Sequence, residues 1–543
     1  MRFAAFFFDG VSRAFHQGPS FSKLVVILAA SSGGLVAYAD SKSDQAIESS
    51  QVAHRKKKMV VLGTGWAGTT FLKNLDSSLY DVQVVSPRNY FAFTPLLPSI
   101  TCGTVEPRSI VEPIRKIIKK KGGDIKFWEA ECFKIDPTNK KVHCRSNIGT
   151  NLDGNGEFLL DYDYLVIAIG ARANTFNTPG VVEHCHFLKE IEDAQKIRRS
   201  VMDCFESASL PNLDEEERKR ILHFVIVGGG PTGVEFAAEL HDFVSEDLSK
   251  LYPTVRDLVK ISVIEAGEHI LTMFDKRITK FAEEKFQRDG IAVKTGYKVV
   301  EVSDKDITMT NASTGKMSVP YGMAVWSTGI GTRPVIMDFM KQIDQANRRV
   351  LATDEWLRVR GCDGVYALGD CATISQRKVM NIFMRPISSS PFSASENIKR
   401  EDISLIFKVA DKDHSGTLTV KEIQDVLDDI CIRYPQVELY LKSKQMSDIV
   451  DLIKDSKGDV QKESVELDIE EFKKALANVD SQVKNLPATA QVAAQQGNYL
   501  ARCFNKMKES DENPEGPLRI RESGRHRFRP FSLYAMDQAM VKL

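Results

Sequence analysis

The sequence has no excess of charge of either sign and no cysteine pair of the Cys-x-x-Cys type. Lys and Arg together number 73, as do Asp and Glu, so no net field favours binding to nucleic acid. The nine cysteines are scattered from Cys102 to Cys503, which suits a mostly reduced protein, excludes a zinc ribbon and leaves no candidate for a dithiol relay. The uncharged run 24–39 has 16 residues, fewer than the roughly 20 that span a bilayer as a helix.

A glycine-rich signature is present twice. Residues 60–68 and 225–233 each contain a short apolar run, then Gly-x-Gly-x-x-Gly, then helix-forming sequence, and the first glycines are 165 residues apart. In this strand–turn–helix context the first glycine permits a tight turn, the second lets backbone approach a diphosphate, and the third lets helix and strand pack closely. The six positions are Gly63, Gly65, Gly68, Gly228, Gly230 and Gly233. Two such units predict two dinucleotides, one donating electrons to the other.

A second repeat supports the first. Downstream of each signature another apolar strand ends in glycine, at Gly170 and Gly329, at offsets of 107 and 101 residues from the first signature glycine. This spacing predicts two similar halves, the second inserted in the first. The chain is expected to return to the first half at 364–372, where a strand delivers Asp370 behind Gly369 into a turn. Such a carboxylate is suited to accept hydrogen bonds from the ribityl or ribose hydroxyls of a flavin dinucleotide.

Residues 411–422 match the calcium loop of an EF-hand at every template position, with helical sequence on both sides. Gly416 makes the sharp turn, and Thr419 can hold a water. The predicted ligands are side-chain oxygens of Asp411, Asp413 and Ser415, the carbonyl of Thr417, and both carboxylate oxygens of Glu422. Residues 465–472 repeat part of the spacing but lack the upstream carboxylates, which indicates a partner hand that binds no metal.

The predicted fold class is therefore α/β, with two Rossmann-like dinucleotide-binding domains, the second inserted in the first, and an all-α EF-hand insertion. The expected segments are a sorting segment at 1–40, the first domain at 57–175, a helical connection at 176–220, the second domain at 221–335, the return of the first at 336–380, the EF-hand domain at 398–478, and a C-terminal region at 480–543. Residues 1–40 are poor in acids and amphipathic, as in organelle transit peptides; a tail without function is the alternative.

Together these motifs resemble those of the type II NAD(P)H:quinone oxidoreductases, in particular the calcium-regulated plant and fungal branch with an EF-hand insertion. The segments that carry the resemblance are 86–98, 228–239, 367–372 and 490–497, and the match covers roughly 57–380 and 398–531. The resemblance implies FAD in the first domain and NAD(P)H in the second. It further implies hydride transfer to flavin, then electron transfer to ubiquinone without proton pumping, at the mitochondrial inner membrane on the intermembrane-space side.

Several residues acquire expected roles. Glu265, at the end of strand 261–264, is placed to bind the adenosine ribose hydroxyls of the donor, and its charge favours NADH over NADPH, whereas Ser86 at the equivalent place in the first half is neutral. Gln491 and Gln495 share one helical face. The resemblance places that helix at the quinone end of the flavin and makes Glu235 a weaker candidate for coupled proton uptake.

Two departures from the family qualify these expectations. A serine-rich insertion at 381–397 interrupts a junction that the family crosses directly, and after Phe531 the family's glycine-rich segment and membrane-docking helices are replaced by 532–543. A truncated or alternatively spliced form is expected. The ending Val541-Lys542-Leu543 only loosely matches a peroxisomal address. A flavoprotein with a non-quinone acceptor and an inactive calcium-binding form remain alternatives, and a homodimer remains open.

Overall fold

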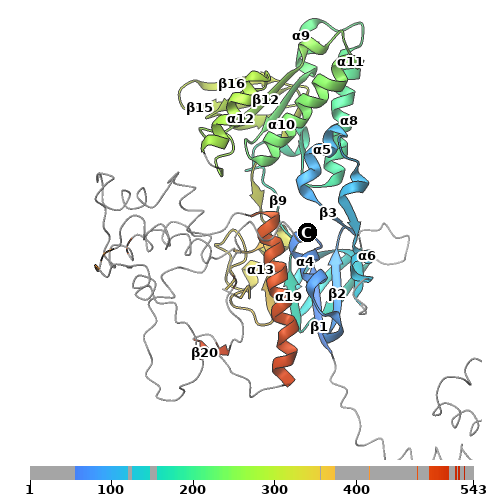
Figure 1. Ribbon diagram of the computed structural model, residues 1–543, viewed down its shortest axis with the longest axis vertical. Coiled ribbons are helices and arrows are strands. Elements are labelled where there is room, and N and C mark those ends of the chain that lie inside the picture. Colours follow the sequence, from blue (N-terminus) through green and yellow to red (C-terminus); the bar gives the residue numbers. More distant parts are fainter. Residues whose placement is uncertain are drawn as a thin grey trace, which may run out of the picture. The chain divides into compact units, whose positions relative to one another are not determined.

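The computed structural model describes residues 56–119, 125–146, 156–274, 276–354, 356–373 and 488–512, with isolated positions at 415, 417, 474, 520–521, 524–525 and 531 (Figure 1). The expected sorting segment 1–40 and the calcium ligands Asp411, Asp413 and Glu422 lie outside these residues. Of the other two calcium ligands, Ser415 donates a hydrogen bond from Oγ to the carbonyl oxygen of Thr417 over 2.9 Å. The calcium site therefore stays a prediction from sequence.

The first sheet has seven strands in the order β19-β8-β1-β2-β5-β6-β7. Five of them are parallel neighbours, and β5, β6 and β7 continue as an antiparallel meander. Their bounds are β1 Lys57–Leu62, β2 Tyr80–Ser86, β5 Lys126–Asp136, β6 Lys141–Ser146, β7 Glu157–Asp161, β8 Tyr164–Ile167 and β19 Val365–Ala367. Because β19 pairs with β8 across about two hundred intervening residues, the second domain is inserted in the first, as predicted.

The second sheet is fully parallel, in the order β10-β17-β11-β12-β13. The strands are β10 Cys185–Phe187, β11 His223–Val227, β12 Lys260–Glu265, β13 Ala292–Thr295 and β17 Met323–Trp326, beside an antiparallel sheet of β14 Lys298–Val302, β15 Asp306–Asn311 and β16 Gly315–Pro320. The predicted α/β fold class is confirmed. One boundary differs, because β10 lies within the expected helical connection 176–220. Its three residues are too few for a period-two pattern, so the parallel partner β17 decides its conformation.

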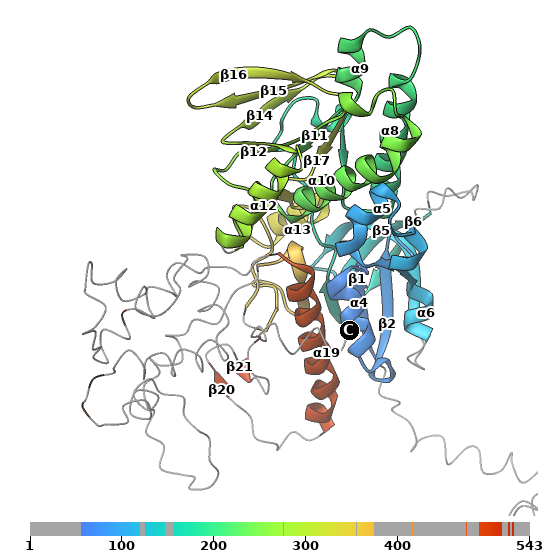
Figure 2. The ribbon, with the colours of Figure 1, turned by 45° about the horizontal axis from the view of Figure 1, so that its top comes forward.

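Helices cover both sheets and continue from the two glycine signatures (Figure 2). The larger ones are α4 Trp66–Asn74, α5 Leu97–Cys102, α6 Ile114–Lys119, α8 Ile191–Ala208, α9 Glu215–Ile221, α10 Pro231–Phe243, α12 Lys276–Arg288, α13 Pro334–Gln342 and α19 Ala490–Glu512. Shorter elements are β3 Tyr90–Ala92, β4 Val111–Pro113, β9 Arg172–Ala173, α7 Val181–His184, α11 Ser249–Leu251, β18 Ile330–Gly331, the 3₁₀ turn η6 Gly369–Cys371, β20 Ile520–Arg521 and β21 Gly524–Arg525.

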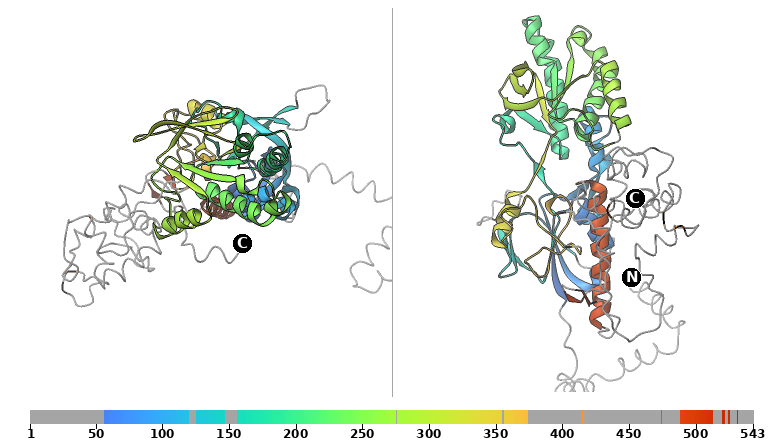
Figure 3. Two further views of the ribbon diagram at one scale, coloured as in Figure 1. Left: turned by 90° about the horizontal axis from the view of Figure 1, so that it is seen from above. Right: turned by 90° about the vertical axis from the view of Figure 1, so that its left-hand side faces the viewer.

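Helix α19 lies against α4 and the first sheet (Figure 3). Phe504, near its C-terminal end, is fully buried, with its ring centroid 5.0 Å from that of Tyr366 and 5.2 Å from that of Tyr164. The Tyr80 hydroxyl donates to the Phe504 carbonyl over 2.8 Å. Truncating a buried phenylalanine costs about 3–5 kcal/mol, so this aromatic cluster anchors α19 to the first domain.

Helix α5 belongs by sequence to the first domain but packs in the core of the second. Leu97, Ile100 and Cys102 are buried in one apolar cluster with Ile197 of α8 and Phe236 of α10. Sequence periodicity over six residues indicates a helix and does not indicate which core receives it. The first domain therefore reaches into the second beside the second glycine signature.

Candidate functional site

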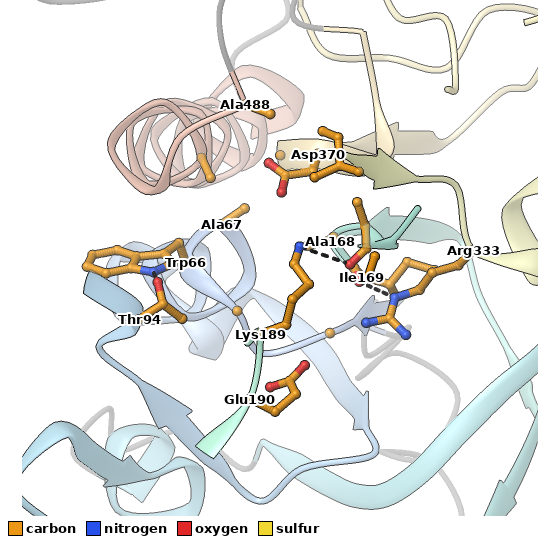
Figure 4. Close-up of a pocket in the computed structure, with 18 of the residues that line it drawn as sticks. Trp66, Ala67, Thr94, Ala168, Ile169, Lys189, Glu190, Arg333, Asp370 and Ala488 are labelled. Atoms are coloured by element: carbon orange, nitrogen blue, oxygen red, sulfur yellow. Dashed lines mark hydrogen bonds between the residues drawn. The ribbon is translucent and has the colours of Figure 1, made fainter. Parts of the chain in front are cut away.

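A cavity of about 710 Å³ lies where the carboxyl ends of β1 and β8 meet residues of the second domain (Figure 4). Ligands of open parallel sheets bind at such strand ends. Its lining includes residues of both domains and of α19: Gly63, Gly65, Arg88, Cys132, Ala168, Ile169, Ala171, Lys189, Glu190, Glu235, Arg333, Gly369, Asp370, Ala490 and Ala493. Both domains therefore contribute to one site.

The first signature has the geometry that its glycines predict. Gly63 has φ +93°, and a Cβ there would overlap the carbonyl of Ala168 on the neighbouring β8 connection. A Cβ at Gly68 would overlap the carbonyl oxygen of Gly63, so this glycine lets α4 approach the turn. Gly65 has no other protein atom within 4 Å of a Cβ position and borders the cavity at the N-terminus of α4. That open backbone surface is suited to an anionic ligand.

The second signature repeats this arrangement. Gly228 has φ +118°, a Cβ at Gly233 would overlap the carbonyl of Gly228, and Gly230 is open within 4 Å. Unlike Gly63 and Gly65, these three glycines are not among the residues that line the 710 Å³ cavity. Glu235, one turn further along α10, does line the cavity. Helix α10 therefore connects the second signature to the shared cavity.

Glu265 lies where the sequence places it, at the end of β12 beside the second signature. Its Oε2 accepts a hydrogen bond from the Gly229 N–H over 2.7 Å, and Oε1 accepts one from the Gly267 N–H over 2.7 Å. Each carboxylate oxygen keeps a further lone pair, so the side chain can still accept from ribose hydroxyls. In the first domain Ser86 instead exchanges a hydrogen bond of 2.8 Å with the Thr64 hydroxyl.

Asp370 enters the cavity beside a lysine that sequence reasoning missed. Lys189 donates from Nζ to the Ala171 carbonyl over 3.3 Å (Figure 4). Burial raises the pKa of Asp370, and the charge of Lys189 partly opposes that rise. Burial lowers the pKa of Lys189, while Asp370 raises it and two arginines lower it. The two groups are thus an electrostatically coupled pair on the cavity wall.

The two arginines, Arg88 and Arg333, were also missed as site residues. Arg88 forms an ion pair with Glu190, and Arg333 donates from Nε to the Ile169 carbonyl over 2.8 Å. Together with Lys189 they place three cations around one cavity, each from a different loop or helix start. No sequence signal predicts this, because the three residues are distant in the chain and follow no ligand-binding spacing.

Helix α19 contributes small side chains to the cavity lining, rather than the glutamine amides that the sequence analysis expected there. Ala490 and Ala493 line the cavity, whereas Gln491 and Gln495, both half-buried, are not among its lining residues. Sequence reasoning also overlooked Gln496, which is fully buried and accepts a hydrogen bond at Oε1 from the Gly369 N–H over 2.7 Å. The structure therefore ties α19 directly to the turn that carries Asp370.

Glu235 borders the cavity from the second domain with a solvent-exposed side chain. Partial enclosure raises the pKa of Glu235, and the like charge of Glu239 raises it further. Both oxygens of Glu239 are held by hydroxyls, Oε1 by Ser99 over 2.8 Å and Oε2 by Thr104 over 2.9 Å. Glu235, like Asp370, is therefore a carboxyl at the cavity that holds its proton to higher pH than the same group free in water.

Two cysteines that the sequence analysis left unpaired face each other on neighbouring strands. Cys132 on β5 is directly opposite Cys144 on β6, and Cys132 lines the cavity. Burial raises the pKa of Cys144 to about 12 and that of Cys132 further, so both thiols are protonated near neutral pH. The absence of a Cys-x-x-Cys motif does not exclude such a pair, because a sheet joins cysteines twelve residues apart; as buried thiols, however, they are poor nucleophiles.

The described residues contain neither a membrane-spanning helix nor a cluster of metal-binding side chains. No helix there is long and apolar enough to cross a bilayer. In the same part of the chain, no three His, Cys, Asp or Glu side chains come together as a metal-binding group.

Two dinucleotide-binding folds that share one cavity define a two-dinucleotide oxidoreductase, and comparison with known proteins agrees. Residues 57–385 match the family model "Pyridine nucleotide-disulphide oxidoreductase". The chain is 63% identical over 533 residues to the mitochondrial external alternative NAD(P)H-ubiquinone oxidoreductase B3 of Arabidopsis thaliana, covering 98% of this chain and 88% of that protein. It is 62% identical to the B1 protein of Solanum tuberosum, covering 98% and 89%.

A solved structure of NDH2 from Plasmodium falciparum in complex with NADH is similar at a TM-score of 0.65, with 33% identity and 83% of each chain covered. The chain belongs to the external alternative NAD(P)H-ubiquinone oxidoreductases, a branch of the pyridine nucleotide-disulphide oxidoreductases. The family predicted from the sequence is confirmed, and the protein is an oxidoreductase.

Proposed function

We propose that this chain is an FAD-dependent, non-proton-pumping NADH:ubiquinone oxidoreductase of the mitochondrial inner membrane. The observation that supports this best is the single cavity bordered by Gly65 of the first signature, Asp370 of the return turn and Glu235 of the second domain. A flavin held there meets a nicotinamide donor from the second domain.

The residues of the cavity fit FAD. Gly65 leaves its backbone open at the N-terminus of α4, where a diphosphate binds favourably. Lys189, Arg88 and Arg333 supply positive charge around the same cavity, and Asp370 supplies an acceptor for hydroxyl groups. Bound FAD would supply the two-electron chemistry. The protein then has to orient donor and acceptor and exclude water, which needs no catalytic metal.

We propose NADH as the preferred donor. The Glu265 carboxylate at the second signature would accept hydrogen bonds from the adenosine ribose hydroxyls of NADH and would repel the 2′-phosphate of NADPH. We propose the α19 side of the cavity as the quinone side. Gln491 and Gln495 of α19 do not line the cavity, so they would donate to the carbonyl of a quinone that approaches this helix from outside the lining. Glu235, whose pKa is raised, would deliver a proton to the reduced quinone.

Control by calcium, through Asp411, Asp413, Ser415, Thr417 and Glu422, belongs to the same proposal and comes from the sequence template. We also propose that residues 1–40 target the protein to the mitochondrion, where it lies on the intermembrane-space side of the inner membrane. The names of the relatives support the mitochondrial part of this proposal.

The decisive experiment is an assay of the purified full chain with FAD, NADH and a short-chain ubiquinone. Quinol formation equal to NADH consumed, with activity lost on removal of FAD, is the expected result. NADH oxidation that proceeds only with ferricyanide or oxygen and yields no quinol would contradict the proposal and favour a different acceptor.

A further inference from the structure

A buried hydrogen bond joins α19 to the turn that carries Asp370. The side chain of Gln496 has no exposed surface, and its Oε1 accepts from the Gly369 N–H over 2.7 Å across 127 residues of sequence. Gly369 is the first residue of η6, with φ +67°, and the first N–H groups of a helical turn have no partner within it. Gln496 therefore caps η6 from another helix.

Of the two polar atoms in the Gln496 amide, the oxygen makes the hydrogen bond to Gly369 and the nitrogen makes none with a described residue. Among the described residues, Nε2 of Gln496 is enclosed without a hydrogen-bond partner. A buried unpaired amide N–H costs free energy, and an apolar side chain of the same shape would avoid that cost. Within the part of the chain that the structure describes, the hydrogen bond from Gly369 is the interaction of this side chain that offsets the cost.

Close packing leaves α19 little freedom around this bond. A Cβ at Gly497 would overlap the carbonyl oxygen of Ala67, in the first turn of α4, and one at Gly369 would lie 3.5 Å from Cβ of Ala493. Gln496 is about 100° around the helix from Gln495, so it faces α4 and η6 rather than the side that carries Gln491 and Gln495. A small rotation of α19 would therefore displace the Gln496 oxygen from the Gly369 N–H and change the packing of Ala493 against Gly369.

We infer that Gln496 is a positioning residue that couples α19, the helix proposed to meet the quinone, to Asp370, the acceptor proposed to orient FAD. The inference rests on the proposed function and extends it to a residue outside the cavity lining. It predicts that the state of bound flavin depends on the Gln496 oxygen and not on the docking of α19 in general.

The chain offers a matched control at the other end of α19. Asn505 also bridges to backbone, since its Oδ1 accepts from the Asp76 N–H over 2.7 Å and its Nδ2 donates to the Asn74 carbonyl over 2.9 Å. Asn505→Leu removes an amide bridge of the same kind far from η6. Gln496→Met removes the acceptor at similar volume, and Gln496→Glu restores an acceptor oxygen.

The test uses the full chain and measures FAD dissociation, the reduction potential of bound FAD, and hydrogen exchange at 368–372. Gln496→Met should weaken FAD binding about 10-fold, shift the potential and speed exchange at Gly369, since it leaves that N–H unpaired. Gln496→Glu should restore FAD binding and slow exchange at Gly369, because it returns an acceptor oxygen. Asn505→Leu should change none of the three quantities, although it lowers the melting temperature.

Unchanged FAD affinity and potential in Gln496→Met would overturn the inference, as would equal loosening of FAD in Asn505→Leu. If Gln496→Met does not fold, Gln496→Glu against wild type decides by exchange at Gly369, which should remain slow. A wild-type chain that binds no FAD would instead overturn the proposed function, so the two failures are distinguishable.

Discussion

The carboxylate of Glu265 is tied to the turn of the second signature, because its Oε2 accepts from the Gly229 N–H over 2.7 Å. The residue that would select the donor therefore also holds the turn that would bind the donor's diphosphate. Removing its charge should affect selectivity first and the turn second, because a glutamine retains one acceptor oxygen for one of the two glycine N–H groups.

Glu265→Gln should raise the ratio of kcat/KM for NADPH to that for NADH about tenfold, because the like-charge repulsion of a 2′-phosphate is removed. Steady-state kinetics with both donors measures the ratio. Glu268→Gln, which removes an exposed charge three residues further on, is the control and should leave it unchanged. An unchanged ratio in Glu265→Gln would mean that this carboxylate does not contact the donor.

Gly65 and Gly230 have no protein atom within 4 Å of a Cβ position, so substitutions there should change dinucleotide binding without changing folding. Gly65→Ala meets no protein atom within 4 Å, so it should fold normally and weaken FAD binding at least about tenfold, because the methyl group occupies space beside the diphosphate. Gly230→Ala should instead raise KM for NADH and leave FAD bound. Flavin content and donor kinetics of both variants test this pair, and loss of FAD in Gly230→Ala would contradict the assignment of the two signatures.

Glu235 should impose a pH dependence on quinone reduction. If its protonated form delivers the proton, activity should fall as pH rises through its raised pKa, and Glu235→Gln should remove that limb of the profile. Glu239→Gln removes the like charge that raises the pKa of Glu235, so the limb should move to lower pH and remain present. A limb that persists in Glu235→Gln belongs to another group.

Calcium should raise quinone reductase activity, with half-maximal effect between about 0.1 and 10 µM, because the loop has three carboxylates and a neutral Ser415. Asp411→Ala should abolish the response while bound FAD stays unchanged. Asp428→Ala, in the sequence that follows the loop, is the control and should respond as wild type. Equal activity with calcium and with chelator, in a chain shown to bind the ion, would reduce the hand to a structural role.

Residues 1–40 fused to a fluorescent reporter should direct it to mitochondria, because the segment is amphipathic and nearly free of acids. Fluorescence microscopy with organelle markers measures this. A cytosolic reporter would contradict the prediction. If the full chain carries the reporter to peroxisomes, and removal of residues 541–543 abolishes this, the C-terminal peroxisomal address would be favoured instead.

The insertion of one dinucleotide fold in another could be predicted because glycine signatures and strand-ending glycines are local and repeat at matched offsets. Asp370 could be predicted for the same reason, since the glycine before it marks a turn after a strand. Gln496 could not, because its signal is a hydrogen bond to a backbone N–H 127 residues away. The strand β10 was likewise decided by its neighbour β17 rather than by its own three residues.

By itself the sequence determined the two nucleotide folds, their order and the calcium-loop pattern, because steric demands at glycines and the spacing of ligands act over a few residues. Only the tertiary structure decided which charges meet. Lys189, Arg88 and Arg333 surround one cavity because sheets and loops from distant parts of the chain end there. It also placed α5 in the core of the second domain and Ala490, rather than Gln491, at the cavity, since packing between elements settles which helix face is buried.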